Sequence, residues 1–106
     1  MVKRAYDIVM ETPLGRRCGT LFLKESCGVL EGAIDILQHK NTVHGVIDEL
    51  GACKLWGTLL ALVYTVEFCA VGVANENGLW LKLRTAENWQ YQIHGVPVLP
   101  KKGQKQ

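Results

Sequence analysis

The most apolar stretch of this sequence runs from Leu55 to Ala74, and it constrains the fold more than any other feature. Glu67 is its only charged residue. The stretch is long enough to cross a bilayer as one helix. Its β-branched residues favour strands instead, and Glu67 would be costly at mid-membrane. We therefore expect two strands and no membrane span, with a reversal near Ala61–Leu62 that has no turn chemistry of its own.

An alternation of apolar and polar residues with a period of two continues along the rest of the chain, which is typical of half-buried strands. It predicts eight strands, at about residues 5–11, 17–24, 29–37, 42–48, 53–60, 63–73, 79–85 and 89–96. Turn residues separate several of them, and the sequence from Asn75 to Gly78 is the clearest hairpin signal, because Asn-Gly suits a turn that matches strand twist. The polar residues 38–41 are predicted to form a loop.

Glycines recur on the predicted inward face of the strands: Gly19, Gly32, Gly45, Gly57, Gly72 and Gly95. Glycine weakens a strand, but it allows the sharp coiling that a small closed barrel requires. Eight short strands joined by tight turns predict an all-β fold, an eight-stranded antiparallel up-and-down β-barrel. The alternative is a two-sheet β-sandwich. The interior of such a barrel is filled by side chains or holds one small ligand.

The length of 106 residues predicts a single domain, residues 1–98, followed by a flexible basic tail, residues 99–106. The formal net charge is +2, and the tail carries three of the lysines, so no basic face for nucleic acid is expected. The first residues do not resemble a signal peptide, which predicts a cytoplasmic protein. The four cysteines form no CxxC pair, so we expect neither a metal nor another cofactor.

Several segments of the chain resemble those of small, uncharacterised bacterial β-barrel proteins with a lipocalin-like or streptavidin-like (calycin-like) shape. These segments are TPLGRRCGTL, NTVHGVIDELG, GTL, YTVEFCAVG and GLWLKLRT, and the resemblance extends over about residues 4–96. It implies a barrel and supplies no functional residues. The group is expected to have a Pro/Gly turn between the fifth and sixth strands, where this chain has Leu60-Ala61-Leu62-Val63.

No catalytic residue can be identified from the sequence. His44 and His94 each precede an inward glycine, so both are predicted to point outward, on strands that lie far apart. Ser26, the only serine, lies in a turn, and the glycines are not clustered into a phosphate-binding loop. Because no acid, base or nucleophile falls into a convergent set, a non-enzymatic role is favoured.

Two sets of apolar residues suggest two functions. One set is predicted to point inward, where it fills the barrel or lines a pocket for a small apolar or aromatic ligand: Tyr6, Met10, Tyr64, Phe68, Trp89 and Tyr91. The other set is predicted to point outward and to form the interface of a homodimer: Trp56, Leu60, Val63, Val71 and Trp80. The first set predicts a ligand-binding module. The second predicts a structural or interaction module that acts through an oligomeric outer surface.

Overall fold

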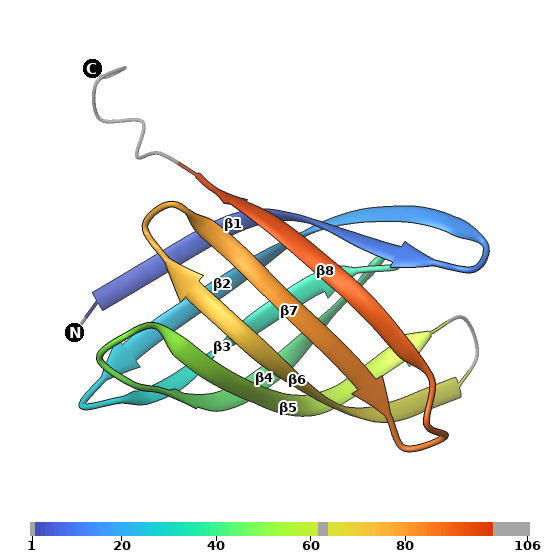
Figure 1. Cartoon of the computed structure of the whole chain (residues 1–106). Coiled ribbons are helices and arrows are strands. Elements are labelled where there is room, and N and C mark those ends of the chain that lie inside the picture. Colours follow the sequence, from blue (N-terminus) through green and yellow to red (C-terminus); the bar gives the residue numbers. More distant parts are fainter. Residues whose placement is uncertain (1, 62–63, 99–106) are drawn as a thin grey trace.

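The computed structural model describes residues 2–61 and 64–98, and these form a closed barrel of eight strands (Figure 1). The strands are β1 (Val2–Thr12), β2 (Gly15–Ser26), β3 (Val29–Ile36), β4 (His39–Ile47), β5 (Ala52–Ala61), β6 (Tyr64–Asn75), β7 (Gly78–Thr85) and β8 (Gln90–Pro97). Each strand pairs antiparallel with the next, and β8 pairs with β1, so that Gly95 lies opposite Ile8. The predicted up-and-down barrel is therefore confirmed, and the sandwich alternative is wrong because the sheet closes.

The apolar stretch from Leu55 to Ala74 contributes to both β5 and β6, as predicted. The two strands pair over most of their length, with Leu55 opposite Ala70 and Trp56 opposite Cys69. In the part of the chain that the structure describes, no helix has the length and apolar character needed to cross a membrane. The predicted reversal near Ala61–Leu62 and the interface residue Val63 lie outside the described residues.

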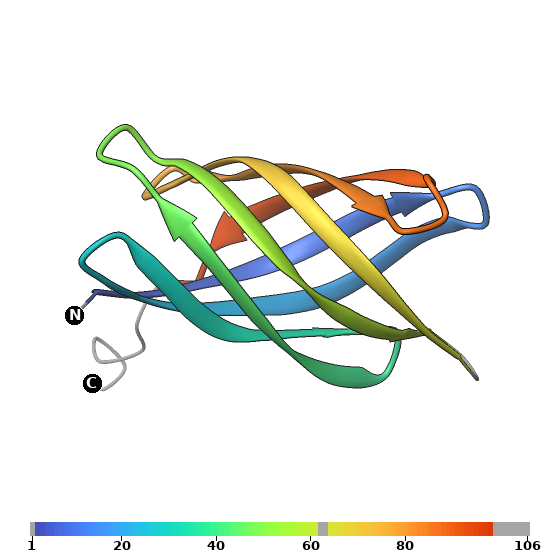
Figure 2. The ribbon, with the colours of Figure 1, turned by 90° about the horizontal axis from the view of Figure 1, so that it is seen from below.

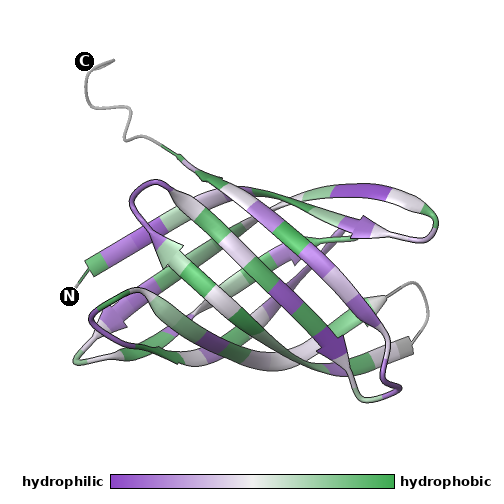
Figure 3. Cartoon of the chain, viewed as in Figure 1, coloured by the Kyte–Doolittle hydropathy of each residue, from purple (hydrophilic) through white to green (hydrophobic). Residues whose placement is uncertain are grey.

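Alternation along the strands places one set of apolar side chains inside the barrel, and Figure 3 shows it as bands of opposite hydropathy along the ribbon. Residues that face each other across neighbouring strands share a side of the sheet, so the inward set of one strand meets that of the next. The most deeply buried side chains come from seven of the strands: Tyr6, Ile8, Leu21, Leu23, Leu30, Ile36, Val43, Leu55, Leu79, Leu83 and Ile93. They form one continuous core.

The inward glycines lie where neighbouring strands cross closely. A Cβ atom on Gly57 would lie 2.8 Å from the carbonyl oxygen of Thr42. A Cβ atom on Gly72 would collide with the carbonyl oxygen of Trp80. Backbone atoms occupy the space that a side chain needs, so these positions allow the tight coiling of the wall.

The connection between β3 and β4 differs from the predicted polar loop. Its turn is only Leu37 and Gln38, and β4 already begins at His39. Both turn residues have positive φ, 58° for Leu37 and 68° for Gln38. Two-residue hairpins require this geometry and normally use Asn or Gly for it. The sequence therefore carries no signal for a turn at Leu37, and the preceding strand was predicted to extend through it.

The two ends of the barrel differ because two of its hairpins are longer than the others. The β5–β6 hairpin pairs as far as Ala61 and Tyr64, whereas β7 pairs with β6 only as far as Phe68 and Thr85. The β1–β2 hairpin likewise extends beyond the start of the β2–β3 ladder at Thr20. Both long hairpins project at the same end of the barrel (Figure 2). This end, which also carries the β3–β4 and β7–β8 turns, is called the mouth below, and the opposite end is called the closed end.

Candidate functional site

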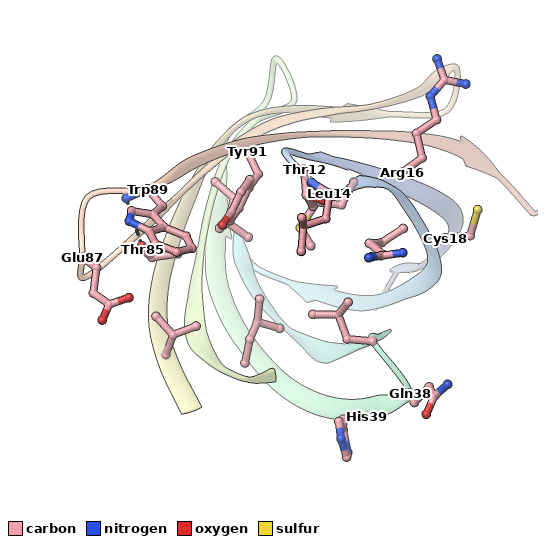
Figure 4. Close-up of a pocket in the computed structure, with 16 residues that line it drawn as sticks. Thr12, Leu14, Arg16, Cys18, Gln38, His39, Thr85, Glu87, Trp89 and Tyr91 are labelled. Atoms are coloured by element: carbon pink, nitrogen blue, oxygen red, sulfur yellow. Dashed lines mark hydrogen bonds between the residues drawn. The ribbon is translucent and has the colours of Figure 1, made fainter. Parts of the chain in front are cut away.

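A cavity of about 790 Å³ opens at the mouth (Figure 4). All four hairpins that meet at this end contribute to its lining. Its apolar lining residues include Met10, Leu14, Leu37, Leu59, Val66 and Leu83. Polar and aromatic residues complete the lining nearer to the solvent. The barrel interior is thus packed with side chains over much of its length and hollow at one end.

The floor of the mouth cavity is apolar. Met10, Leu59 and Leu83 line the cavity and are also buried members of the core. They come from β1, β5 and β7, so strands from across the barrel wall converge there. Water against such a surface is displaced favourably by apolar groups, with a gain of roughly 25 cal/mol for each Å² buried.

One side of the mouth is aromatic. The rings of Trp89 and Tyr91 meet edge to face, with centroids 6.5 Å apart and planes at 87°. In Figure 4 Tyr91 points toward the opening and Trp89 lies at its edge. Such rings offer flat apolar surfaces to a planar ligand. The aromatic pair therefore extends the apolar floor up one wall of the mouth.

Trp89 was predicted to begin the eighth strand with its side chain inside, but β8 begins at Gln90 and Trp89 is 55% exposed. The turn before it is closed by local hydrogen bonds. The amide of Trp89 donates to Oγ1 of Thr85 at 3.1 Å, and the amide of Thr85 donates to the carbonyl oxygen of Trp89 at 2.9 Å. Asn88 takes a positive φ of 69° to complete the turn. These bonds hold Trp89 in the β7–β8 turn at the edge of the mouth.

Charged and titratable residues at the mouth lie on different sides of it. Arg16, Arg17, His39 and Glu87 all contribute to the lining. Nε of Arg16 lies 3.2 Å from Oε2 of Glu11 in an exposed ion pair. In Figure 4 Arg16 points away from the opening, and Glu87 lies at the outer edge of the β7–β8 turn. The mouth therefore has an apolar floor, an aromatic wall and a partly charged edge.

The wall between β4 and β5 is held by a side chain near the mouth. Backbone pairing of these strands ends at Val43 and Gly57. Beyond this point Oδ1 of Asn41 accepts a hydrogen bond from the amide of Leu60 at 3.2 Å. Nδ2 of Asn41 donates to the carbonyl oxygen of His39 at 3.4 Å. One asparagine thus joins the two strands where their ladder has ended.

The closed end is filled by polar as well as apolar side chains. Arg4 and Glu25 form a half-buried ion pair with a nitrogen–oxygen distance of 2.9 Å, and this contact raises the pKa of Arg4. Burial raises the pKa of Tyr6 and that of Cys53, the latter to about 11. A thiol with so high a pKa is a poor nucleophile. We assign a packing role to these groups.

The predicted ligand-binding residues are divided between the cavity and the core. Met10, Trp89 and Tyr91 line the mouth cavity. Tyr6 and Phe68 are buried in the core. The side chain of Tyr64 lies outside the described part of the structure. A role in binding stays a prediction for these residues.

Arg17 and Leu14 line the mouth but were not among the predicted site residues. The inward position of Arg17 could have been predicted from the sequence, because Arg17 lies two positions before the inward residue Gly19 in a strand with a period of two. No sequence pattern predicts the position of Leu14, because it lies in a turn and only the tertiary structure brings it over the opening.

The predicted interface residues lie on the outer wall. Trp56 on β5, Val71 on β6 and Trp80 on β7 are 41%, 49% and 48% exposed. Leu60 is half-buried. In the register Trp80 lies opposite Val73, which is also exposed. Apolar side chains thus stand on the outer face of three neighbouring strands.

The described residues contain no cluster of three or more His, Cys, Asp or Glu side chains able to hold a metal ion. His44 lies on β4 and His94 on β8, and each is opposite an exposed tryptophan, Trp56 and Trp80 respectively. All four cysteines are free thiols.

No protein-family model matches the chain, and neither a curated protein nor a solved structure shows significant similarity to it.

Proposed function

We propose that this protein is a calycin-like binding module that holds a small apolar or aromatic ligand in the mouth of its barrel. The observation that supports this proposal is the cavity of about 790 Å³ whose floor is formed by Met10, Leu59 and Leu83. Ligand pockets are typically about 300–1,000 Å³ in volume and mostly apolar, with a few polar groups that orient the ligand. The mouth cavity has these properties.

The energetics favour a ligand with a flat or aliphatic body. Burial of about 200 Å² of apolar ligand surface contributes roughly 5 kcal/mol, before the cost of immobilising the ligand. Trp89 and Tyr91, whose rings meet edge to face, line the side of the same space. A gain of about 5 kcal/mol corresponds to a Kd of about 0.2 mM, so this apolar contact alone predicts a Kd of about 0.1–1 mM for a small aromatic compound.

Titration with the neutral dye N-phenyl-1-naphthylamine tests this function, because the fluorescence of the dye rises in an apolar site. We expect saturable binding to the wild-type protein and loss of binding in Leu59→Trp, which fills the floor of the cavity. Val96→Trp adds the same side chain at an exposed position of β8 and is expected to bind like the wild type. Native mass spectrometry of protein purified from cells is expected to show an additional small mass. Absence of both dye binding and additional mass would contradict the proposal.

We propose a homodimer as the second candidate function, with the protein acting as an interaction module through the outer face of β5, β6 and β7. The observation that favours it is the exposure of Trp56, Val71 and Trp80 on these adjacent strands. Contiguous exposed apolar surface usually marks an interface, and two-fold dimers use the same surface on both copies. Light scattering at tens of micromolar protein tests this candidate, and a monomer mass would remove it.

A further inference from the structure

We propose that the ligand of the mouth carries an acidic group, and that Arg17 binds this group at the entrance of the cavity. The ligand class is thus a small aromatic or aliphatic acid whose apolar body lies on the cavity floor. This inference rests on the proposed ligand-binding function and adds the chemistry that selects the ligand.

The position of Arg17 follows from the register of β1 and β2. Arg17 lies directly opposite Met10, and Met10 is buried inside the barrel. Residues opposite each other in an antiparallel pair share one face of the sheet, so Arg17 is on the inward face. It also lines the mouth cavity. The register thus places a permanent cation, exposed to solvent, at the entrance of the cavity above the apolar floor.

The charge of Arg17 is not balanced by a carboxylate. Arg16, its neighbour, pairs with Glu11. The side chain of Arg17 forms neither an ion pair nor a hydrogen bond with any other residue that the structure describes. Glu87 also lines the cavity but makes no ion pair with Arg17. The N–H donors of the Arg17 side chain can therefore form hydrogen bonds with a ligand.

Guanidinium geometry determines the kind of group that fits. Arginine presents paired N–H donors in a planar fork, which matches the two oxygens of a carboxylate or a sulfonate. Arg17 is exposed at the entrance, so its donors are open to an incoming ligand. A neutral polar group forms weaker hydrogen bonds with the guanidinium, so it contributes less to the binding free energy. The cavity therefore orients an amphiphile, with its acid at Arg17 and its body toward Leu59 and Leu83.

A pair of dyes with the same rings tests the inference. N-phenyl-1-naphthylamine is neutral, and its 8-sulfonate adds one acidic group. In Arg17→Gln we expect the Kd of the sulfonate to rise about tenfold, because a charge-assisted hydrogen bond contributes about that much. The Kd of the neutral dye is expected to stay within about twofold, because its apolar contacts are retained. Lys82→Gln removes the same charge from an exposed position of β7 and is expected to change neither value.

Each outcome separates the two proposals. If the neutral dye binds and Arg17→Gln leaves the sulfonate affinity unchanged, or weakens both dyes equally, the role of Arg17 is overturned while the binding function stands. If neither dye binds the wild-type protein, the binding function itself fails. Arg17→Lys keeps the charge but loses the fork, so an intermediate Kd for the sulfonate is expected. Thermal unfolding of each variant confirms that binding is compared between folded proteins.

Discussion

The hydroxyl of Tyr6 donates a hydrogen bond to the backbone carbonyl oxygen of Asn75 at 3.0 Å, across 69 positions of the sequence. Tyr6 is an inward residue of β1, and Asn75 ends β6 next to the β6–β7 turn. The bond therefore crosses the closed end of the barrel between strands that are not neighbours. It satisfies the polar end of a buried tyrosine.

Removal of this bond is expected to destabilise the fold without affecting the mouth. Tyr6→Phe keeps the ring and leaves the Asn75 carbonyl without this donor, so we expect a loss of about 1–2 kcal/mol in the free energy of unfolding. Urea denaturation measures the loss, and titration with the neutral dye serves as the control. A variant as stable as the wild type would show that the bond contributes nothing.

Gly72→Ala tests whether close strand crossing sets the shape of the barrel. The added Cβ would collide with the carbonyl oxygen of Trp80, and a backbone atom in a closed sheet cannot move aside without disturbing its ladder. We expect a loss of about 2–3 kcal/mol, in the range for overpacked sites. Thr42→Ala, a substitution at an exposed strand residue, is expected to stay within about 0.5 kcal/mol. Equal unfolding midpoints for the two variants would contradict the role of Gly72.

The pKa of Cys53 predicts a loss of stability at high pH. Burial is the largest cause of its rise from 9.0 to about 11; Arg4 opposes this rise and Asp48 adds to it. Between these values the folded protein retains a proton that the unfolded chain releases, so the stabilisation is complete below about pH 9 and falls as the pH rises toward 11. Urea denaturation over this range measures the slope, and Cys53→Ala is expected to reduce it. An unchanged slope would show that other groups account for it.

Loss of the Asn41 side chain is expected to loosen the wall beside the mouth. In Asn41→Ala the amide of Leu60 loses its acceptor on β4, so we expect a cost of about 1 kcal/mol and faster hydrogen exchange at this amide. The amide of Leu55, a core residue within the β4–β5 ladder, is the internal control and is expected to exchange as before. Uniform acceleration at both amides would indicate global destabilisation instead.

Trp80→Lys tests the proposed dimer. The substitution places a third lysine near Lys54 and Lys82, which both lie opposite Val71 in the register. Like charges on two facing copies repel, so we expect the mass from light scattering to fall from that of a dimer to that of a monomer. Leu50→Lys, at an exposed turn residue of the closed end, is the matched control. A wild-type protein that is already monomeric would rule out the interface.

The strands were predictable because inward apolar residues recur at every second position along each of them. Most of the apolar positions that the sequence indicated, from Tyr6 and Ile8 in β1 to Ile93 in β8, are buried in the barrel. The turn at Leu37 was not predictable. Positive φ at Leu37 is imposed by the pairing of β3 with β4, and nothing local to that residue favours it. The position of Trp89 was not predictable from local sequence either, because hydrogen bonds with Thr85 determine where β8 begins.

By itself, the sequence determined the number of strands, the side of the sheet on which most strand residues lie and the glycines that let the wall coil. These properties are local, because pleating and backbone sterics act over a few residues. Only the tertiary structure decided that the barrel is packed at one end and hollow at the other. That difference depends on how far the β1–β2 and β5–β6 hairpins extend beyond their neighbours. The same relation brings Arg17, Leu59 and Trp89 around one cavity, although they are far apart in the chain.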